Sequence, residues 1–148
     1  MYKHILIATD GSELATKALE QGLALAKRDN AQVTLVTVTE PWSALEMAQE
    51  ARARRPDPIS HFEAIAAAAA DRILDAALQR ANALGVNCER VHVKDQHPAD
   101  GIIDTAKEKA CDLIVMASHG RRGVSRFLLG SQAFEVLTRC TVPALIVR

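Results

Sequence analysis

Short runs of apolar or β-branched residues alternate along the chain with longer stretches of helical periodicity. The runs lie at 5–8, 32–38, 90–93, 113–116 and 144–147. Continuous rather than alternating hydrophobicity is typical of strands that are covered on both faces, as in parallel sheets. The pattern therefore predicts five buried strands, each separated from the next by a segment that forms a helix.

Four helices are predicted between these strands. They run from Ser12 to Asn30, from Ile59 to Leu84, from Pro98 to Ala110, and from about Ser131 onward. Ser12 is a favoured N-cap, Pro98 suits the first turn of a helix, and Gly85 is a typical stop. Residues 39–58 hold three prolines and break this rhythm, so we expect a mobile excursion with one helical turn. The run Ala66–Ala70 is expected to pack closely on the sheet.

Strands that alternate with helices predict an open, twisted, five-stranded parallel sheet with helices on both faces, an α/β fold. Such a sheet binds its ligand in the crevice outside the carboxyl ends of its strands, where the winding reverses. A functional site is therefore expected at residues 8–12, at 38–41, and from Ala117 onward. The chain's 148 residues match the length of one domain, residues 1–148.

Composition and charge narrow the classes of partner. Eighteen basic and 18 acidic residues give a formal net charge of +0, and aromatic residues make up 3%. A chain with no net positive charge and few aromatic residues is poorly suited to binding nucleic acid. Cys88, Cys111 and Cys140 show no metal-ligand spacing and are expected to be small buried hydrophobes of a reducing compartment. The sequence has no membrane-spanning run, which favours a soluble, cytoplasmic protein.

The stretch from Ser118 to Ser131 carries the candidate chemistry. Its glycines allow close approach of the backbone to a ligand, and Gly130-Ser131 stands at a helix N-terminus, which favours a phosphate. Arg121, Arg122 and Arg126 add positive charge. The stretch matches neither GxxxxGK[ST] nor GxGxxG, so on spacing alone a phosphate cradle and a plain surface turn both remain open.

Other polar residues near these strand ends also have two interpretations. Asp10 either satisfies turn amides or contacts a ribose or an adenine edge. His119 either pairs with a phosphate or is an exposed loop histidine. The chain shows no defensible Ser/His/Asp arrangement, so catalytic residues are not predicted.

Four segments together resemble the universal stress protein family. They are 5–12, 112–120, 128–131 and 142–147, and the resemblance spans the whole chain in order. It implies a Rossmann-like sheet similar to that of the adenine nucleotide alpha hydrolases. It also implies a homodimer joined through the final strands and, in one branch, ATP at the carboxyl edge of the sheet.

The ATP-binding branch carries the pattern G-x2-G-x9-G-[ST]. Gly120 and Gly130-Ser131 match it, whereas Ala117 replaces its first glycine. The resemblance implies binding residues Ala8, Thr9, Asp10, Val38, Met116, Ala117, Ser118, His119, Gly120, Arg121, Gly130, Ser131 and Gln132. The resemblance implies that the phosphates are held by five residues of this chain: Ser118, Gly120, Gly130, Ser131 and Gln132. Asp10 with Ala8-Thr9 would flank the ribose and adenine, the Val38 backbone would contact the adenine edge, and Mg²⁺ would bridge phosphate oxygens.

The resulting hypothesis is a homodimeric, ATP-binding regulator of the stress response rather than an enzyme. One alternative is a nucleotide-free dimeric interaction module that contacts an unknown protein partner, which the Ala117 departure favours. Another is a slow ATPase or an autophosphorylating protein, with Ser125 or Ser131 as the acceptor.

Overall fold

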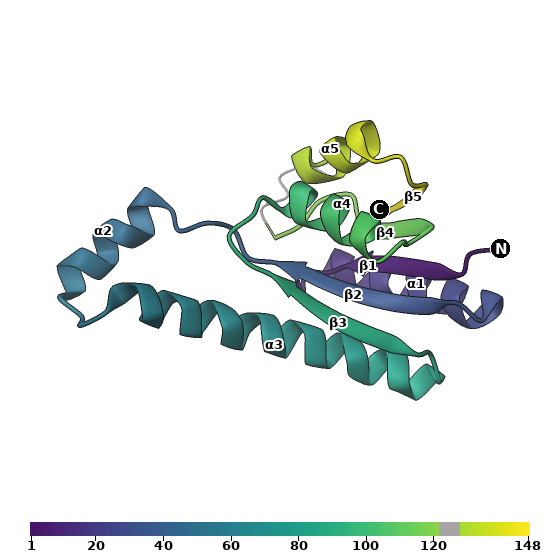
Figure 1. Cartoon of the computed structure of the whole chain (residues 1–148), viewed down its shortest axis with the longest axis horizontal. Coiled ribbons are helices and arrows are strands. Elements are labelled where there is room, and N and C mark those ends of the chain that lie inside the picture. The colour runs from purple at the N-terminus through teal and green to yellow at the C-terminus, as the bar shows by residue number, and fades with distance from the viewer. Residues whose placement is uncertain (122–127) are drawn as a thin grey trace.

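A single parallel sheet organises the molecule. The computed structural model describes residues 1–121 and 128–148. Within these residues the strands lie in the order β3-β2-β1-β4-β5, and every neighbouring pair is parallel (Figure 1). The strands are β1 (His4–Ala8), β2 (Gln32–Val38), β3 (Cys88–Val93), β4 (Leu113–Ala117) and β5 (Ala144–Val147). The predicted fold class is confirmed, and β3 begins two residues before the predicted start.

Helices cover both faces of the sheet. They are α1 (Glu13–Asp29), α2 (Ala44–Ala53), α3 (Pro58–Leu84), α4 (Pro98–Glu108) and α5 (Ser131–Arg139). Odd-numbered side chains of β1 and β4, such as Ile7 and Val115, pack with α1 and α3. Even-numbered ones, such as Leu6 and Ile114, pack with α4 and α5. The central strands are thus buried on both sides, which explains their continuous hydrophobicity.

The predicted helix ends are largely confirmed. The Ser12 side chain accepts a hydrogen bond from the amide of Ala15 at 3.2 Å, and Asn30 closes α1 with φ 53°. Gly85 ends α3 with φ 70°, a left-handed conformation that glycine adopts without strain. The third predicted helix was too long, because α4 ends at Glu108 and Ala110 has φ 52°.

Residues 44–53 form α2, so the predicted excursion with one helical turn was wrong. Ser43 and Glu46 form a reciprocal capping box, in which each side chain accepts a hydrogen bond from the backbone amide of the other. This arrangement satisfies two of the amides at the start of the helix. No residue of α2 is buried, which explains why apolar periodicity did not reveal the helix.

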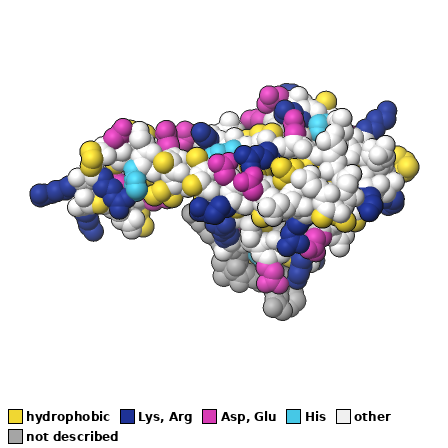
Figure 2. Space-filling view, turned by 90° about the horizontal axis from the view of Figure 1, so that it is seen from below, with side chains coloured by type: hydrophobic (Ala, Val, Ile, Leu, Met, Phe, Trp, Pro, Cys, Tyr) yellow, Lys and Arg dark blue, Asp and Glu magenta, His cyan; other side chains and the backbone are white. Residues whose placement is uncertain are grey.

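The first half of α3 extends beyond the sheet and pairs with α2. We call α2 together with residues 58–69 of α3 the arm; Figure 1 shows it projecting from one end of the molecule. Only Ala70 of the run Ala66–Ala70 is buried, so the expectation that this run packs on the sheet was wrong for the other four residues. Side chains of both charges lie on the arm (Figure 2), and Glu50 of α2 pairs with Arg55 of the turn that joins α2 to α3.

All three cysteines are free, and the prediction that they are buried is confirmed for one of them. Cys111 is buried, whereas Cys88 and Cys140 are half-buried. Burial raises the pKa of the Cys88 and Cys111 thiols to about 11 in each case. In the described part of the chain, none of the helices is both long enough and apolar enough to span a bilayer.

Candidate functional site

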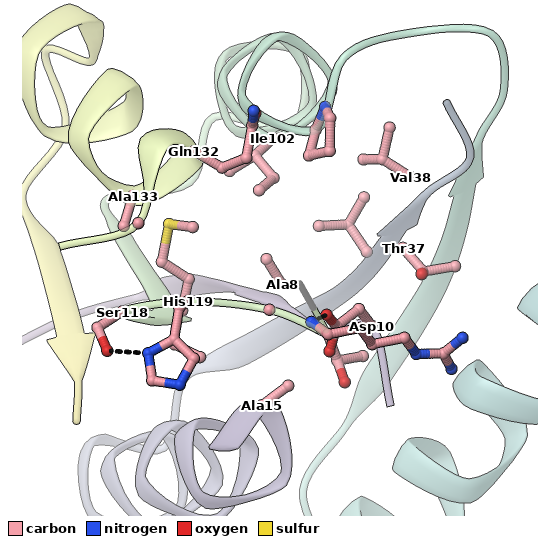
Figure 3. Close-up of a pocket in the computed structure, with 18 of the residues that line it drawn as sticks. Ala8, Asp10, Ala15, Thr37, Val38, Ile102, Ser118, His119, Gln132 and Ala133 are labelled. Carbon is pink, nitrogen blue, oxygen red and sulfur yellow. Dashed lines mark hydrogen bonds between the residues drawn. The ribbon is translucent and has the colours of Figure 1, made fainter. Parts of the chain in front are cut away.

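A cavity of about 350 Å³ lies at the carboxyl edge of the sheet. It opens where β1 and β4 lie side by side and their following segments lead to opposite faces, which is the switch point of a doubly wound sheet. The ends of β1, β2 and β4 and the first turns of α4 and α5 surround it (Figure 3). The site therefore lies where the sequence analysis expects it.

Asp10 joins the two loops that flank the switch point. Its Oδ1 accepts a hydrogen bond from the amide of Ser12 at 2.9 Å, and its Oδ2 accepts one from the amide of Arg121, also at 2.9 Å. The carboxylate thus satisfies turn amides, one of the two roles considered for it, while it also lines the cavity. It fixes the start of the loop after β4 against the end of β1.

At two glycines of this loop, the backbone lies so close to neighbouring atoms that little room is left for a side chain. A Cβ added to Gly120 would lie 2.5 Å from Oδ2 of Asp10, closer than any real contact allows. A Cβ added to Gly130 would lie 2.6 Å from the carbonyl oxygen of Ser118, which accepts a hydrogen bond from the Gly130 amide at 2.7 Å. The two ends of the loop are therefore held against one another by bare backbone.

The N-terminus of α5 faces the cavity without a capping side chain. Gly130 is the N-cap and offers no side chain, and its carbonyl accepts the amide of Phe134. The amides of Ser131, Gln132 and Ala133 precede the first intrahelical hydrogen bond, and all three residues line the cavity. These amides and the positive end of the helix dipole favour an anion here.

Gln132 links this helix to α4. Its Oε1 accepts a hydrogen bond from the amide of Ala99 at 2.8 Å. His97, the N-cap of α4, makes no side-chain capping bond, so Gln132 supplies the cap from another helix. The carbonyl of the Gln132 side chain is thus engaged within the protein, which leaves its NH₂ group as the part able to donate to a ligand.

The backbone of Val38 faces the cavity through its strand register. The β1–β2 pairing ends at Ala8 and Val36, where the amide of Thr9 donates to the carbonyl of Val36. The amide of Thr39 instead donates to Val93 of β3. Because backbone groups alternate along a strand, the amide and carbonyl of Val38 lie on the β1 side, beyond the end of that strand. A donor and an acceptor thus adjoin the cavity side by side.

The cavity holds few charged groups. Oγ of Ser118 lies 3.2 Å from Nδ1 of His119, and Figure 3 shows this contact on the wall opposite Asp10. Arg121 also lines the cavity, and its guanidinium makes no ion pair with another described residue. Arg122, Ser125 and Arg126, named in the sequence analysis, lie outside the described residues.

Ala117 packs in the core and also lines the cavity. It is the last residue of β4, is 7% exposed, and belongs to the core cluster between the sheet and α1. Neighbouring side chains of a strand point to opposite faces, and Met116 belongs to the other cluster. The methyl group of Ala117, which replaces the first glycine of the pattern, therefore packs in the core.

The structure brings together all 13 residues that the resemblance implies, because each lines the same cavity. Their contact with a nucleotide stays a prediction. Glu40 and Ala133 also line the cavity and lie within the segments where the site was expected, whereas the sequence analysis missed five further lining residues: Ala15, Val36, Thr37, Pro98 and Ile102. Pro98 could have been found, because it marks the start of the helix after the third predicted strand. In a parallel sheet such a helix begins at the carboxyl edge, where the site is expected.

The residues described offer no protein-built metal centre. No group of three or more His, Cys, Asp or Glu side chains among them is arranged to hold a metal ion. A cation at this site would need ligands from another molecule, such as phosphate oxygens.

Comparison with known proteins relates this chain to one family over its full length. The model of the universal stress protein family matches residues 1–148. Universal stress protein YxiE of Bacillus subtilis is 31% identical over 149 residues, covering 100% of both chains. The solved structure of hypothetical protein MJ0577 superposes with a TM-score of 0.81 at 25% identity, covering 99% of this chain and 96% of that one. A universal stress protein in complex with cAMP gives 0.69 at 26% identity, covering 99% and 97%.

Proposed function

The chain belongs to the universal stress protein family, and on this premise we propose that it binds an adenine nucleotide in the cavity at the carboxyl edge of its sheet. The backbone cradle formed by Gly120, Gly130 and the first turn of α5 is the observation that carries the proposal. A structural relative bound to cAMP supports the ligand class. Ala117 lines the cavity and packs in the core cluster, so a cavity is present although this residue replaces the first glycine of the pattern.

The adenine ring fits the end of the cavity near β2. The amide and carbonyl of Val38 provide an adjacent donor and acceptor, which complement N1 and the N6 amino group of adenine. Ile102 and Met116 supply apolar surface for the faces of the ring. Guanine carries the opposite hydrogen-bonding pattern at these positions, so the site should discriminate against it.

The ribose and phosphates then follow toward α5. Asp10 stands beside the ribose, and the phosphates lie against the loop after β4, between Ser118 and Gly120 on one side and Ser131 on the other. The orphan amides of α5 donate to phosphate oxygens in this arrangement. For ATP, Mg²⁺ would bridge phosphate oxygens, because the described residues provide no cage of their own.

We place this activity in a cytoplasmic homodimer that regulates a stress response, with binding rather than turnover as its chemistry. Both carboxylate oxygens of Asp10 accept backbone amides, so this carboxylate serves to hold the two loops together. A slow ATPase remains the second candidate function. ATP turnover well above one per second, abolished by changing His119, would favour it over a regulator.

Calorimetric titration tests the proposal directly. We expect saturable binding of AMP, cAMP, ADP or ATP with Mg²⁺, and no comparable binding of GMP or GTP. Gly120→Ala should weaken binding at least tenfold, because its methyl would displace the Asp10 carboxylate. Gly85→Asn is the matched control, since Gly85 is remote from neighbouring atoms and Asn tolerates its left-handed φ. Absence of binding for every adenine nucleotide would overturn the proposal.

A further inference from the structure

A second cavity of about 570 Å³ adjoins the first on the side of α3. Five residues line both cavities: Asp10, Thr37, Val38, Glu40 and Arg121. The two cavities therefore border one another, and a ligand that reaches past these residues would enter the second cavity from the first. A volume of this size is ordinary for a small-molecule site.

One wall of the second cavity is an apolar face of α3. Phe62, Ile65, Ala66, Ala69 and Ile73 line it at the i, i+3, i+4, i+7 and i+11 positions of the helix. At 1.5 Å per residue, the face from Phe62 to Ile73 is about 16 Å long. The ring of Trp42 packs behind Phe62, with centroids 4.8 Å apart. A long apolar wall of this kind suits an extended hydrocarbon group.

Arg121 stands where this wall meets the loop after β4. A Cβ added to Gly11 would lie 3.3 Å from Nη2 of Arg121 and 3.0 Å from Cγ1 of Ile73. The guanidinium and the Ile73 side chain therefore lie close to one another beside Gly11. The backbone amide of Arg121 is held by Asp10, so the residue is fixed to the site. Within the described part of the chain its guanidinium makes no ion pair, and it supplies positive charge at a border that the carboxylates of Asp10 and Glu40 also line.

We propose that the two cavities bind one ligand, an adenine nucleotide whose phosphate carries an apolar acyl or alkyl group. The inference rests on the proposed nucleotide site and adds the class of group attached to the phosphate. The nucleotide lies in the first cavity, its substituted phosphate pairs with Arg121, and the hydrocarbon lies along α3. Such a phosphate retains one negative charge, which a single guanidinium balances.

Calorimetry with AMP and its decyl phosphate ester tests this inference. We expect the ester to bind at least tenfold more tightly than AMP, because its methylene groups leave water. Ala69→Leu narrows the second cavity along α3 and should reduce the affinity for the ester toward that for AMP. Ala68→Leu adds the same side chain at an exposed neighbouring position and should preserve the advantage of the ester. Arg121→Gln should weaken binding of the ester at least tenfold.

Trp42 provides an independent readout, because it is the only tryptophan of the chain and contacts Phe62. The ester should change its fluorescence, and AMP should change it much less. If AMP binds and the ester binds no more tightly, the second-cavity inference is overturned while the nucleotide site stands. If neither binds, both proposals fail. If decyl phosphate without adenosine binds as tightly as the ester, the single-ligand arrangement is overturned.

Discussion

Gly101 connects the packing of α4 to the shape of the candidate site. A Cβ at this position would lie 2.8 and 3.1 Å from the two γ carbons of Val38 and 3.2 Å from Cγ1 of Val93. Valine is stiff at χ1 and cannot turn both methyl groups away. We expect Gly101→Ala to lower the free energy of unfolding by about 1–2 kcal/mol, even though alanine favours helices. Urea denaturation measures this change.

The same substitution should weaken adenine-nucleotide binding several-fold, since it displaces the residue whose backbone adjoins the cavity. Asp104→Ala, at an exposed position one turn later in α4, is the control and should alter neither property. Unchanged stability and affinity for Gly101→Ala would show that α4 moves aside and that Val38 is not confined.

Single residues also show how far the site could be predicted from sequence. Gly120 and Gly130 were predictable because their spacing and their place before a helix carry the signal. The hydrogen bond from Arg121 to Asp10 joins residues 111 positions apart and required the sheet order. The hydrogen bond that the Gln132 side chain accepts from the Ala99 amide could not be predicted either, because it depends on how α4 and α5 pack.

At the scale of elements, α2 depends on its own sequence rather than on burial. Ser43 caps the helix through Glu46, and no residue of α2 is buried. Ser43→Ala should therefore destabilise α2 by about 1 kcal/mol. Hydrogen exchange should accelerate in residues 44–53 and remain unchanged in α1. An unchanged rate in α2 would show that contacts within the arm, and not the cap, maintain the helix.

Elements with a buried face were predictable, and those without one were not. β2, β5 and the start of α5 match the sequence analysis, because burial imposes a period on the side chains. α2 lacks a buried face, and the alanine run of α3 follows helical periodicity whether or not a sheet lies beneath it. The sequence therefore predicted the helix α3, but not how far this helix extends beyond the sheet.

Asp112 fixes the start of β1 beside β4 and should make stability depend on pH. Burial opposes its ionisation, but hydrogen bonds from the amides of Lys3 and His4, at 2.8 and 3.0 Å, outweigh it and hold its pKa below the ordinary value. A lowered pKa in the folded state stabilises the fold above the ordinary value of 3.8, and this contribution disappears as the pH falls through the lowered pKa.

We therefore expect Asp112→Ala to be less stable than the wild type by about 1–2 kcal/mol at neutral pH. The difference should diminish as the pH falls below 3.8, the ordinary value. Urea denaturation across this range measures it, with Asp104→Ala as a control that shows no such trend. A difference that is constant with pH would attribute the effect to packing rather than to the charge.

At the scale of the whole molecule, the two ends of the sheet differ in how they are covered. The second half of α3 lies over the β2–β3 side and the arm extends beyond it, whereas β5 forms the opposite edge, next to α5 (Figure 1). β5 reads Ala-Leu-Ile-Val, and it lacks the charged residues that normally protect an exposed edge from pairing with another strand. On the adjoining helix, Phe134 is 57% exposed and Leu137 is 45% exposed. An apolar edge beside an apolar helix surface favours association with a second copy.

We predict that the protein sediments at twice its 16.0 kDa mass and that the double change Phe134→Glu and Leu137→Glu gives monomers. Charged side chains at a desolvated interface would lack partners, so association should weaken at least a hundredfold. Leu84→Glu, at a 40% exposed position of α3, is the matched control and should remain dimeric. Nucleotide affinity and far-UV circular dichroism establish that the monomer is folded. If Ile59→Glu dissociates the dimer while the α5 changes do not, the interface lies on the arm and the β5 assignment is wrong.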